Sequence, residues 1–167
     1  MSRPTAQALI ECFQLLPHPE GCYYRETYRD TGTIPRDVLP GRFAGPRSYS
    51  TAIYYLIPAG KRSGLHRISA DEVWHFYLGD PLQLEVIHPD GRLEQVILGP
   101  NITKGERVQF IVPAGCWFGG QLIGSGEYAF GGCTVAPGFD FADFALADRA
   151  ILLRQFPQHR AMIERLT

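Results

Sequence analysis

A long series of short apolar runs, separated by turn-forming residues, occupies the sequence between residues 48 and 135. The runs are rich in β-branched and aromatic residues, and segments such as PAGK, HPDGR and GSGE supply the Gly, Asp and Pro of tight reversals. The pattern predicts about eight strands, over residues 48–57, 63–68, 71–78, 82–88, 92–98, 107–112, 116–123 and 127–135. Strands at this spacing favour an all-β sandwich or barrel, closed enough to limit exposed edges.

Helical patterns flank the strand region on both sides. Apolar residues recur at helical spacing between residues 3 and 16, where Ser2 offers a hydroxyl cap and Pro17 stops the helix. After the strands, Asp148 is placed to cap one short helix and Pro157 to begin a second. We therefore expect an N-terminal helix and two short C-terminal helices around the strands. Residues 29–47 are rich in Gly, Pro and charge, which predicts a long mobile loop that can lie over a pocket.

The size and charge of the chain exclude several classes of protein. Its 167 residues predict one domain, residues 1–167. The formal net charge of -1 gives no large field to attract a nucleic acid polymer or an anionic membrane. The apolar stripe near the N-terminus is interrupted by polar residues, unlike a signal peptide, and no segment approaches a membrane span. The four cysteines include no C-x-x-C pair, which favours reduced thiols and a cytoplasmic location.

A histidine and a carboxylate stand close together in the segment SGLHRISADEVWHFYLG. Strand alternation predicts that His66 and Ile68 share one face, and that the next strand turns four residues inward: Glu72, Trp74, Phe76 and Leu78. His75 then points outward, to the surface or to a subunit contact. His66 and Glu72 are thus expected to meet inside a barrel lined by aromatic residues.

The predicted pair suits acid–base chemistry. Burial among aromatic side chains raises the pKa of a carboxylic acid, and a neighbouring imidazolium lowers it. The alternative is purely structural, because buried polar groups usually hydrogen-bond to each other. Two further residues are candidates for ligand contacts: Arg25 as a fork for a carboxylate or phosphate, and Trp117 as a stacking platform. Their structural alternatives are a solvated strand edge for Arg25 and a core or interface position for Trp117.

The sequence resembles the cupins, and over nearly its whole length it resembles the uncharacterised branch called DUF985, or cupin family five. The resemblance rests on HPEGCYYRETY, STAIYYLIPAGKRSGLHRISADEVWHFYLGDPL, LGPNITKGERVQFIVPAGCWFGG and GCTVAPGFDFADFAL. It implies a double-stranded β-helix, the cupin jelly roll, which is usually dimeric. We therefore expect a homodimer that binds a small-molecule ligand.

Two of the four metal-ligand positions of the cupin motifs are changed in this chain. His66 and Glu72 match the first histidine and the glutamate, but Ile68 stands at the second histidine and Phe118 at the last. A catalytic metal generally needs three protein ligands and an open position, and only two remain. The resemblance thus implies no metal ligands and no cofactor, with a divalent metal held by an unusual third ligand as the alternative.

Metal-free relatives of this arrangement include the deoxysugar epimerases of the RmlC type, in which a histidine assisted by a carboxylate removes a proton beside a ketone. The resemblance implies His66 and Glu72 as catalytic residues, with Tyr23, Tyr54 or Tyr128 as the acid. The expected ligand is small and polar, derived from a carbohydrate or a nucleotide. Two alternatives stay open: a metal-dependent oxygenase or isomerase, and a binding module without turnover. The predicted ligand-binding residues are Arg25, Tyr23, Trp74, Trp117, Phe118 and Tyr128.

Overall fold

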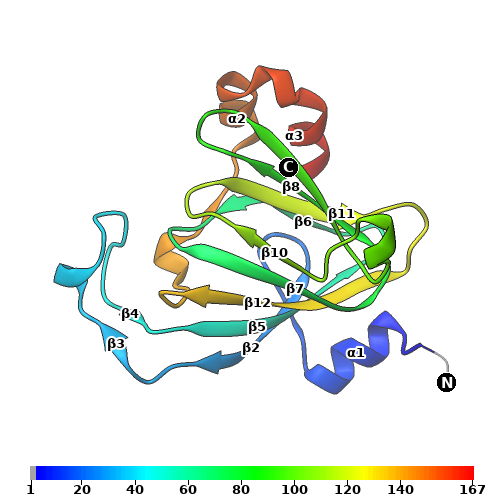
Figure 1. Cartoon of the computed structure of the whole chain (residues 1–167), viewed down its shortest axis with the longest axis horizontal. Helices are drawn as coiled ribbons and strands as arrows, with labels where there is room; N and C mark the ends of the chain where they lie inside the picture. Colours follow the sequence, from blue (N-terminus) through cyan, green and yellow to red (C-terminus); the bar gives the residue numbers. More distant parts are fainter. Residues whose placement is uncertain (1–2) are drawn as a thin grey trace.

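The computed structural model describes residues 3–167 and contains two facing antiparallel β-sheets (Figure 1). The six-stranded sheet has the order β1 (Leu16–Pro17), β2 (Tyr23–Arg29), β5 (Thr51–Pro58), β12 (Tyr128–Ala136), β7 (Asp71–Gly79), β10 (Gln109–Val112). The five-stranded sheet has the order β13 (Ala145–Leu146), β6 (Arg62–Arg67), β11 (Trp117–Leu122), β8 (Leu82–Ile87), β9 (Leu93–Leu98). The prediction of an all-β jelly roll is confirmed.

The eight strands predicted between residues 48 and 135 are all present, as β5 to β12. Turn glycines fix the reversals between them: Gly91 (φ 85°) in HPDGR and Gly115 (φ 79°) in PAG both occupy the left-handed region. A side chain with a Cβ atom would be strained at either position. The hydrophobic core between the two sheets is built from the inward residues of these strands, among them Tyr55, Trp74 and Phe118.

The N-terminal helix α1 (Ala6–Phe13) is shorter than the predicted span of residues 3–16. Its cap is Thr5, whose side-chain oxygen accepts from the Ala8 N–H at 3.2 Å; the predicted cap, Ser2, lies outside the described residues. The helix ends at Gln14, which adopts a left-handed conformation (φ 52°). Its apolar face packs on the outer side of the six-stranded sheet, against Leu56 and neighbouring residues.

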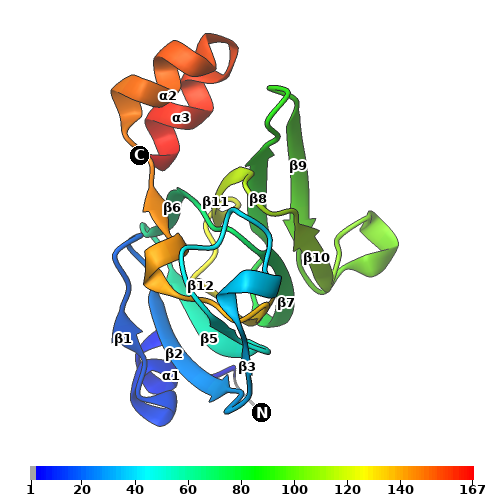
Figure 2. The same cartoon turned by 90° about the vertical axis from the view of Figure 1, so that its left-hand side faces the viewer.

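The two predicted C-terminal helices are present as α2 (Arg149–Gln155) and α3 (Arg160–Leu166). The Asp148 carboxylate caps α2 by accepting from the Ile151 N–H at 2.9 Å, as predicted. Pro157 begins a 3-10 turn, η4 (Pro157–His159), that leads into α3. Figure 2 shows the two helices together at one side of the sheets, where they form a separate hydrophobic cluster with the outer face of the five-stranded sheet. Within residues 3–167, no helix is long and apolar enough to cross a membrane.

Strand β7 follows the predicted alternation over its first half. Glu72, Trp74 and Phe76 are buried, but Leu78 packs in the outer cluster with α1 and not in the core between the sheets. The reason is a β-bulge: β12 residue Gly131 pairs with Phe76 and the preceding residue pairs with Leu78, so one residue of β7 is skipped. A single extra residue reverses the faces of all that follow it.

The segment predicted as a mobile loop contains short elements of its own: β3 (Thr33–Ile34), η1 (Arg36–Val38) and β4 (Arg47–Ser48). β3 pairs with β4, and the segment extends to one side of the sheets, where Figure 1 shows it in light blue. Leu39 and Phe43 from this segment pack with Ile68 and Val135 in a small hydrophobic cluster.

Candidate functional site

A cavity of about 430 Å³ opens between strands of both sheets. It is bounded by a loop before β2, by one face of β2, and by the segment that includes η3 (Phe141–Asp143). Its lining combines carboxylates, imidazoles and aromatic rings: His18, Glu20, Tyr24, Glu26, Arg29, Thr51, Ile53, His66, Ile68, Glu72, Cys133, Val135, Phe139, Asp140, Phe141 and Phe144. His66 and Glu72, which the sequence placed inside the barrel, both line this cavity.

His66 is held by Glu20, a residue that the sequence analysis did not select. Its Nδ1 lies 3.1 Å from a carboxylate oxygen of Glu20 and 2.8 Å from the carbonyl oxygen of Gly64. No hydrogen bond or ion pair joins His66 to Glu72 directly within the described residues. The predicted contact is therefore replaced by one with a residue 46 positions earlier in the chain.

The contacts of Nδ1 determine the tautomer of His66. A backbone carbonyl oxygen can only accept, and a carboxylate also accepts, so Nδ1 must carry the proton. In the neutral ring the lone pair then lies on Nε2, which has no hydrogen-bond partner among residues 3–167. His66 thus has the arrangement of a general base whose second nitrogen is oriented by a carboxylate.

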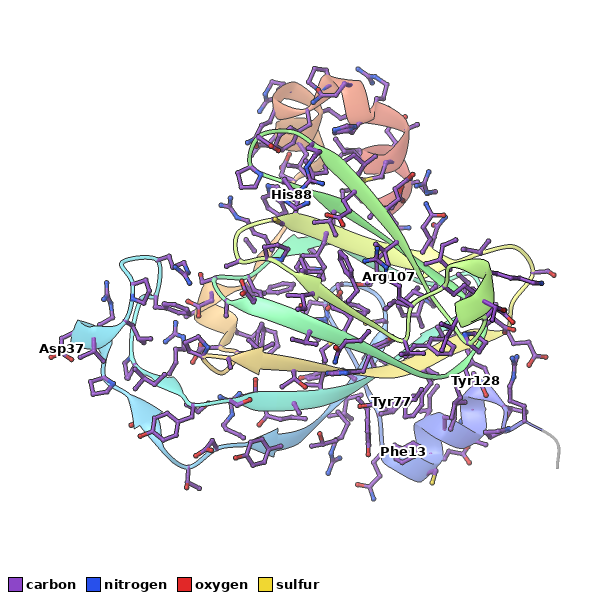
Figure 3. The ribbon with its side chains drawn as sticks, in the orientation of Figure 1. Phe13, Asp37, Tyr77, His88, Arg107 and Tyr128 are labelled. Atoms are coloured by element: carbon purple, nitrogen blue, oxygen red, sulfur yellow. The ribbon has the colours of Figure 1, made fainter. Side chains whose placement is uncertain are left out.

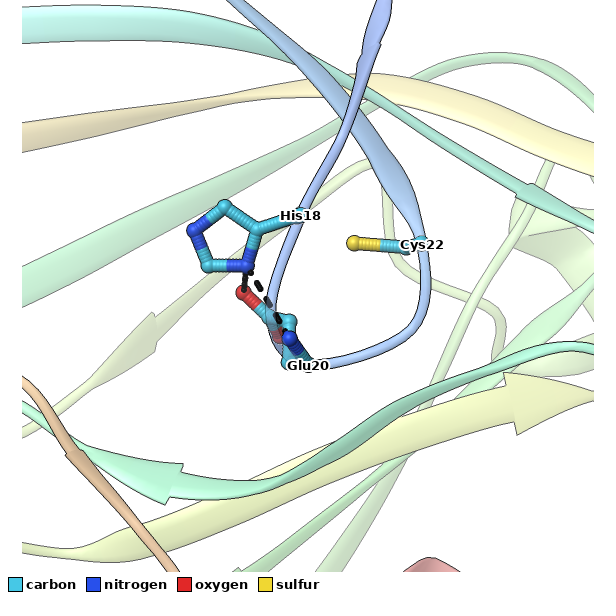
Figure 4. A group of neighbouring side chains, drawn as sticks. All are labelled: His18, Glu20 and Cys22. Atoms are coloured by element: carbon cyan, nitrogen blue, oxygen red, sulfur yellow. Dashed lines mark hydrogen bonds and ion pairs between the residues drawn. The ribbon is translucent and has the colours of Figure 1, made fainter.

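Glu20 lies at the centre of a hydrogen-bonded group. Its second oxygen is 2.8 Å from His18 Nδ1 (Figure 4). Ser63 donates its hydroxyl proton to the same carboxylate. Burial alone would raise the pKa of Glu20, but the positive charge of His66 and the hydrogen bonds from His18 and Ser63 outweigh it. The net shift of the Glu20 pKa is downward, which keeps this carboxylate ionised.

Two glycines bring the Glu20 loop against β6. Gly64 donates its N–H to the Glu20 carbonyl at 2.8 Å, and a Cβ atom on Gly64 would lie only 3.1 Å from that oxygen. Gly21, at φ 103°, likewise approaches the backbone of Arg62. The sequence shows these glycines but not that the segment HPEG folds back onto β6, since this contact depends on tertiary structure.

The pKa of Glu72 is shifted in the opposite direction to that of Glu20. Burial raises its pKa; the charge of His66 opposes this rise and the negative charge of Glu20 adds to it, with a net upward shift. The neighbouring Cys133 thiol is buried too, and its pKa is raised well above the ordinary value for the same reason. The cavity therefore holds two carboxylates whose pKa values are moved apart, an arrangement that separates acid and base roles.

Two of the predicted ligand-binding residues lie next to the cavity without lining it. The Phe118 ring contacts the His66 ring, with centroids 4.1 Å apart, and forms part of the support beneath it. Trp74 is buried in the core beside Phe118, and its indole Nε1 has no hydrogen-bond partner within residues 3–167.

The other predicted ligand-binding residues lie elsewhere. Arg25 is exposed and donates to Gln14, because it is on the face of β2 that points away from the cavity. Tyr23 and Tyr54 belong to the outer cluster with α1. Tyr128 is buried in that cluster as well; it donates to the Pro4 carbonyl at 2.7 Å and is labelled near α1 in Figure 3.

Trp117 packs against the cluster formed by α2 and α3, with the Arg67 guanidinium 4.7 Å from its ring centroid. It follows the inward Cys116, and its own position on β11 faces outward.

Of the tyrosines, Tyr24 is the one that lines the cavity. The alternation of YYRETYR places Tyr24 and Glu26 on one face, and the bulge after Glu26 returns Arg29 to that same face, which sequence reasoning missed.

Comparisons with known proteins identify the family of the chain. Residues 7–147 match the family model described as the cupin superfamily (DUF985). The chain belongs to this cupin family. An uncharacterised protein of Saccharomyces cerevisiae is 30% identical over 145 residues, which cover 82% of this chain and 72% of the yeast protein.

Solved structures are similar to this chain over most of its length. A hypothetical protein from Leishmania major has a TM-score of 0.89 and 35% identity, and covers 98% of this chain and 99% of its own. A protein from Shewanella oneidensis has a TM-score of 0.88 and 37% identity, covering 99% and 98%. Oxalate decarboxylase from Bacillus subtilis is similar at a TM-score of 0.55 and 15% identity, covering 90% of this cupin and 36% of that chain, which shows the fold alone.

The metal positions of the cupin motifs do not fit a metal in this cupin. Ile68 and Phe118 offer no ligand atom, and both are buried hydrophobic residues. A different donor set lies at the edge of the cavity: His18 Nδ1, a Glu20 oxygen and Cys22 Sγ are all within 4.8 Å of one another (Figure 4). Burial, with the charge of Glu20, raises the Cys22 pKa well above its ordinary value, which opposes the thiolate that a metal would require.

Proposed function

We propose that this cupin binds a small polar carbonyl compound and moves a proton at the carbon next to the carbonyl, as a metal-independent isomerase or epimerase. The observation that supports this most directly is the double contact of His66 Nδ1 with Glu20 and the Gly64 carbonyl. It leaves Nε2 as a free base beside a cavity large enough for a small ligand. A base near neutral pH is what removal of such a proton needs.

The other groups in the cavity supply the rest of the reaction. His66 Nε2 takes the proton from carbon, and the electron pair of that C–H bond forms the C=C bond of an enol. Glu72, whose pKa is raised by burial, donates a proton to the carbonyl oxygen as the negative charge develops there. In the isomerase reaction the proton held by His66 goes to the former carbonyl carbon, and Glu72 takes up the proton of the hydroxyl on the adjacent carbon, which becomes the new carbonyl. In the epimerase reaction the enol turns over in the cavity, the proton returns to the opposite face of the same carbon, and Glu72 recovers its proton from the carbonyl oxygen. Glu20 stabilises the imidazolium during this cycle.

The test is exchange of the carbon-bound proton with solvent deuterium. Small sugars and carbonyl acids are incubated with the protein in D₂O, and loss of the proton signal next to the carbonyl is followed by NMR. We expect exchange with at least one compound, and a loss of about 100-fold or more in His66→Gln, the scale of a general base. His75→Gln is the matched control, because His75 contacts Thr134 and Gln109 and does not line the cavity.

Two results would contradict the proposal. Exchange at an unchanged rate in His66→Gln would show that His66 is not the base. Binding of a compound without any exchange would favour the alternative of a binding module without turnover.

A second candidate, a metal-dependent cupin oxygenase or isomerase, rests on the cluster of His18, Glu20 and Cys22. The cluster offers three ligand atoms next to the cavity, which is the number that catalytic zinc sites use. A full equivalent of metal per chain, lost in His18→Ala, would favour this candidate over the metal-free one.

A further inference from the structure

We infer that the ligand of the cavity is an uncharged polyhydroxylated carbonyl compound, such as a free monosaccharide, and not a phosphorylated or nucleotide-linked one. The inference rests on the proposed function for the chemistry of the carbonyl. The class of ligand follows from the charges and surfaces that line the cavity.

Carboxylates outnumber cations in the lining. Four acidic side chains, Glu20, Glu26, Glu72 and Asp140, face a single arginine, Arg29, among the described residues that bound the cavity. Even with Glu72 neutral and one imidazole charged, the acidic groups balance or exceed the basic ones. A phosphate or diphosphate brings about two further negative charges into this lining, where like charges at short distance repel strongly.

The single arginine is already occupied. Arg29 donates to both oxygens of Glu26, at 3.0 Å and 2.7 Å, in a two-bond contact. It also donates to the Phe139 carbonyl at 3.0 Å and to the Ser48 hydroxyl at 3.5 Å, so four of its five N–H groups have partners within residues 3–167. A phosphate would have to displace Glu26 from Arg29 and then lie beside the displaced carboxylate. Sites built for phosphate present free arginine or lysine side chains or backbone N–H groups instead.

The same carboxylates suit hydroxyl groups. An ionised carboxylate is an acceptor only, with about four lone-pair positions, and each hydroxyl of a sugar is a donor. Asp140 uses one oxygen to accept from the Ala142 N–H at 2.8 Å, and its second oxygen has no partner within residues 3–167. The Tyr24 hydroxyl, which also has none in that part of the chain, can donate or accept.

One wall of the cavity is aromatic. The rings of Phe139, Phe141 and Phe144 pack edge to face, with centroids 5.0 to 6.4 Å apart. His18 joins them, with its ring nearly parallel to Phe141 at 5.9 Å and at right angles to Tyr24 at 4.7 Å. A monosaccharide has an apolar C–H face and a rim of hydroxyls, and these match an aromatic wall opposite acceptor groups.

The experiment compares matched pairs of ligands. Glucose, mannose, fructose and ribose are each tested beside their phosphate esters by calorimetry and by the shift in melting temperature, which rises when a ligand binds the native state. We expect at least one free sugar to bind about tenfold or more tightly than its phosphate ester. Glu26→Gln releases Arg29 and removes one negative charge, so this variant should gain about tenfold in affinity for the ester. Glu11→Gln is the control, since it makes the same charge change on the exposed surface of α1.

Each outcome decides the inference. It is overturned if the wild-type protein binds a phosphate ester more tightly than the free sugar, or if no free sugar binds at millimolar concentration. It is also overturned if Glu26→Gln and Glu11→Gln change the affinity for the ester equally. A free sugar that binds without exchanging its proton supports this inference while contradicting the proposed reaction. A phosphate ester that binds more tightly than its free sugar and exchanges its proton contradicts this inference while supporting the proposed reaction.

Discussion

Replacement of Glu20 by glutamine tests whether the hydrogen-bonded group around His66 holds the fold as well as the site. The change keeps the size of the side chain and removes its charge. The carboxylate now accepts from His18, His66 and Ser63, whereas an amide offers one oxygen and two N–H donors. The hydrogen bonds that the amide can still make are therefore with a neutral group and not with a charged one.

The magnitude follows from the loss of that negative charge. The Glu20 side chain is only 11% exposed, so water replaces little of the lost interaction. A hydrogen bond to a charged group contributes about 1.5–3 kcal/mol and a neutral one about 0.5–1.5 kcal/mol, so the substitution should cost about 1–2 kcal/mol of the free energy of unfolding. In a chain of this length, about 2–4 °C of melting temperature is lost for each kcal/mol.

The pH dependence has a definite sign. The pKa of Glu20 is lowered on folding from its ordinary value of 4.5, so its contribution to stability is present above about pH 4.5. It is lost as the pH falls through the folded-state pKa. We therefore expect Glu20→Gln to be less stable than the wild type at neutral pH, and the difference to shrink in acid.

Urea unfolding, followed by the fluorescence of the two tryptophans, measures the effect at neutral pH and at about pH 4. Glu26→Gln is the matched control, because that carboxylate is 40% exposed, and its loss should change stability by about 0.5 kcal/mol or less. The reasoning fails if Glu20→Gln is as stable as the wild type at neutral pH, or if its deficit is the same at both pH values.

Three other predictions concern the cavity and the assembly. Because the pKa of Glu72 is raised by burial, Glu72→Gln should be more stable than the wild type at neutral pH, and this gain should disappear as the pH falls toward 4.5. Urea unfolding measures the difference, and a variant less stable than the wild type at neutral pH would refute the prediction. Elemental analysis of protein prepared without a metal-affinity tag should find well below one metal per chain; a full equivalent lost in His66→Ala would be the contrary result. Light scattering should give about twice the chain mass of 18.7 kDa, because edge strand β10 leaves Ile111 53% exposed beside Val108; a monomer at micromolar concentration would contradict this.

The strands were predictable because their signals are local. Turn residues such as Gly91 and Gly115 require the conformations that separate the strands, and the alternation of residues 71–76 places Glu72 on the inward face whatever its neighbours are. The cap at Asp148 was predictable for the same reason. The bulge that moves Leu78 to the outer cluster left no such signal, because it depends on the pairing of β7 with β12.

The site was predictable only in part. Its two strand residues, His66 and Glu72, were found by alternation and by resemblance to the cupin motifs. Glu20 was missed because it lies in a turn-like segment, HPEG, whose position against β6 depends on a backbone hydrogen bond to Gly64. The aromatic wall was missed because the segment that carries it, near Phe141, follows the last long strand and has no strand pattern of its own.

The aromatic wall is attached to the rest of the protein by a buried ion pair. Arg47 donates to both oxygens of Asp143, at 2.6 Å and 2.7 Å, and the two side chains are 4% and 5% exposed. Arg47 belongs to β4, which pairs only with β3 and lies outside both main sheets. The position of the wall is therefore fixed in part by a strand that belongs to neither main sheet. A ligand that packs on Phe141 and Phe144 stabilises the wall and, through Asp143, the position of Arg47, so occupancy of the cavity should raise the hydrogen-exchange protection of β3 and β4.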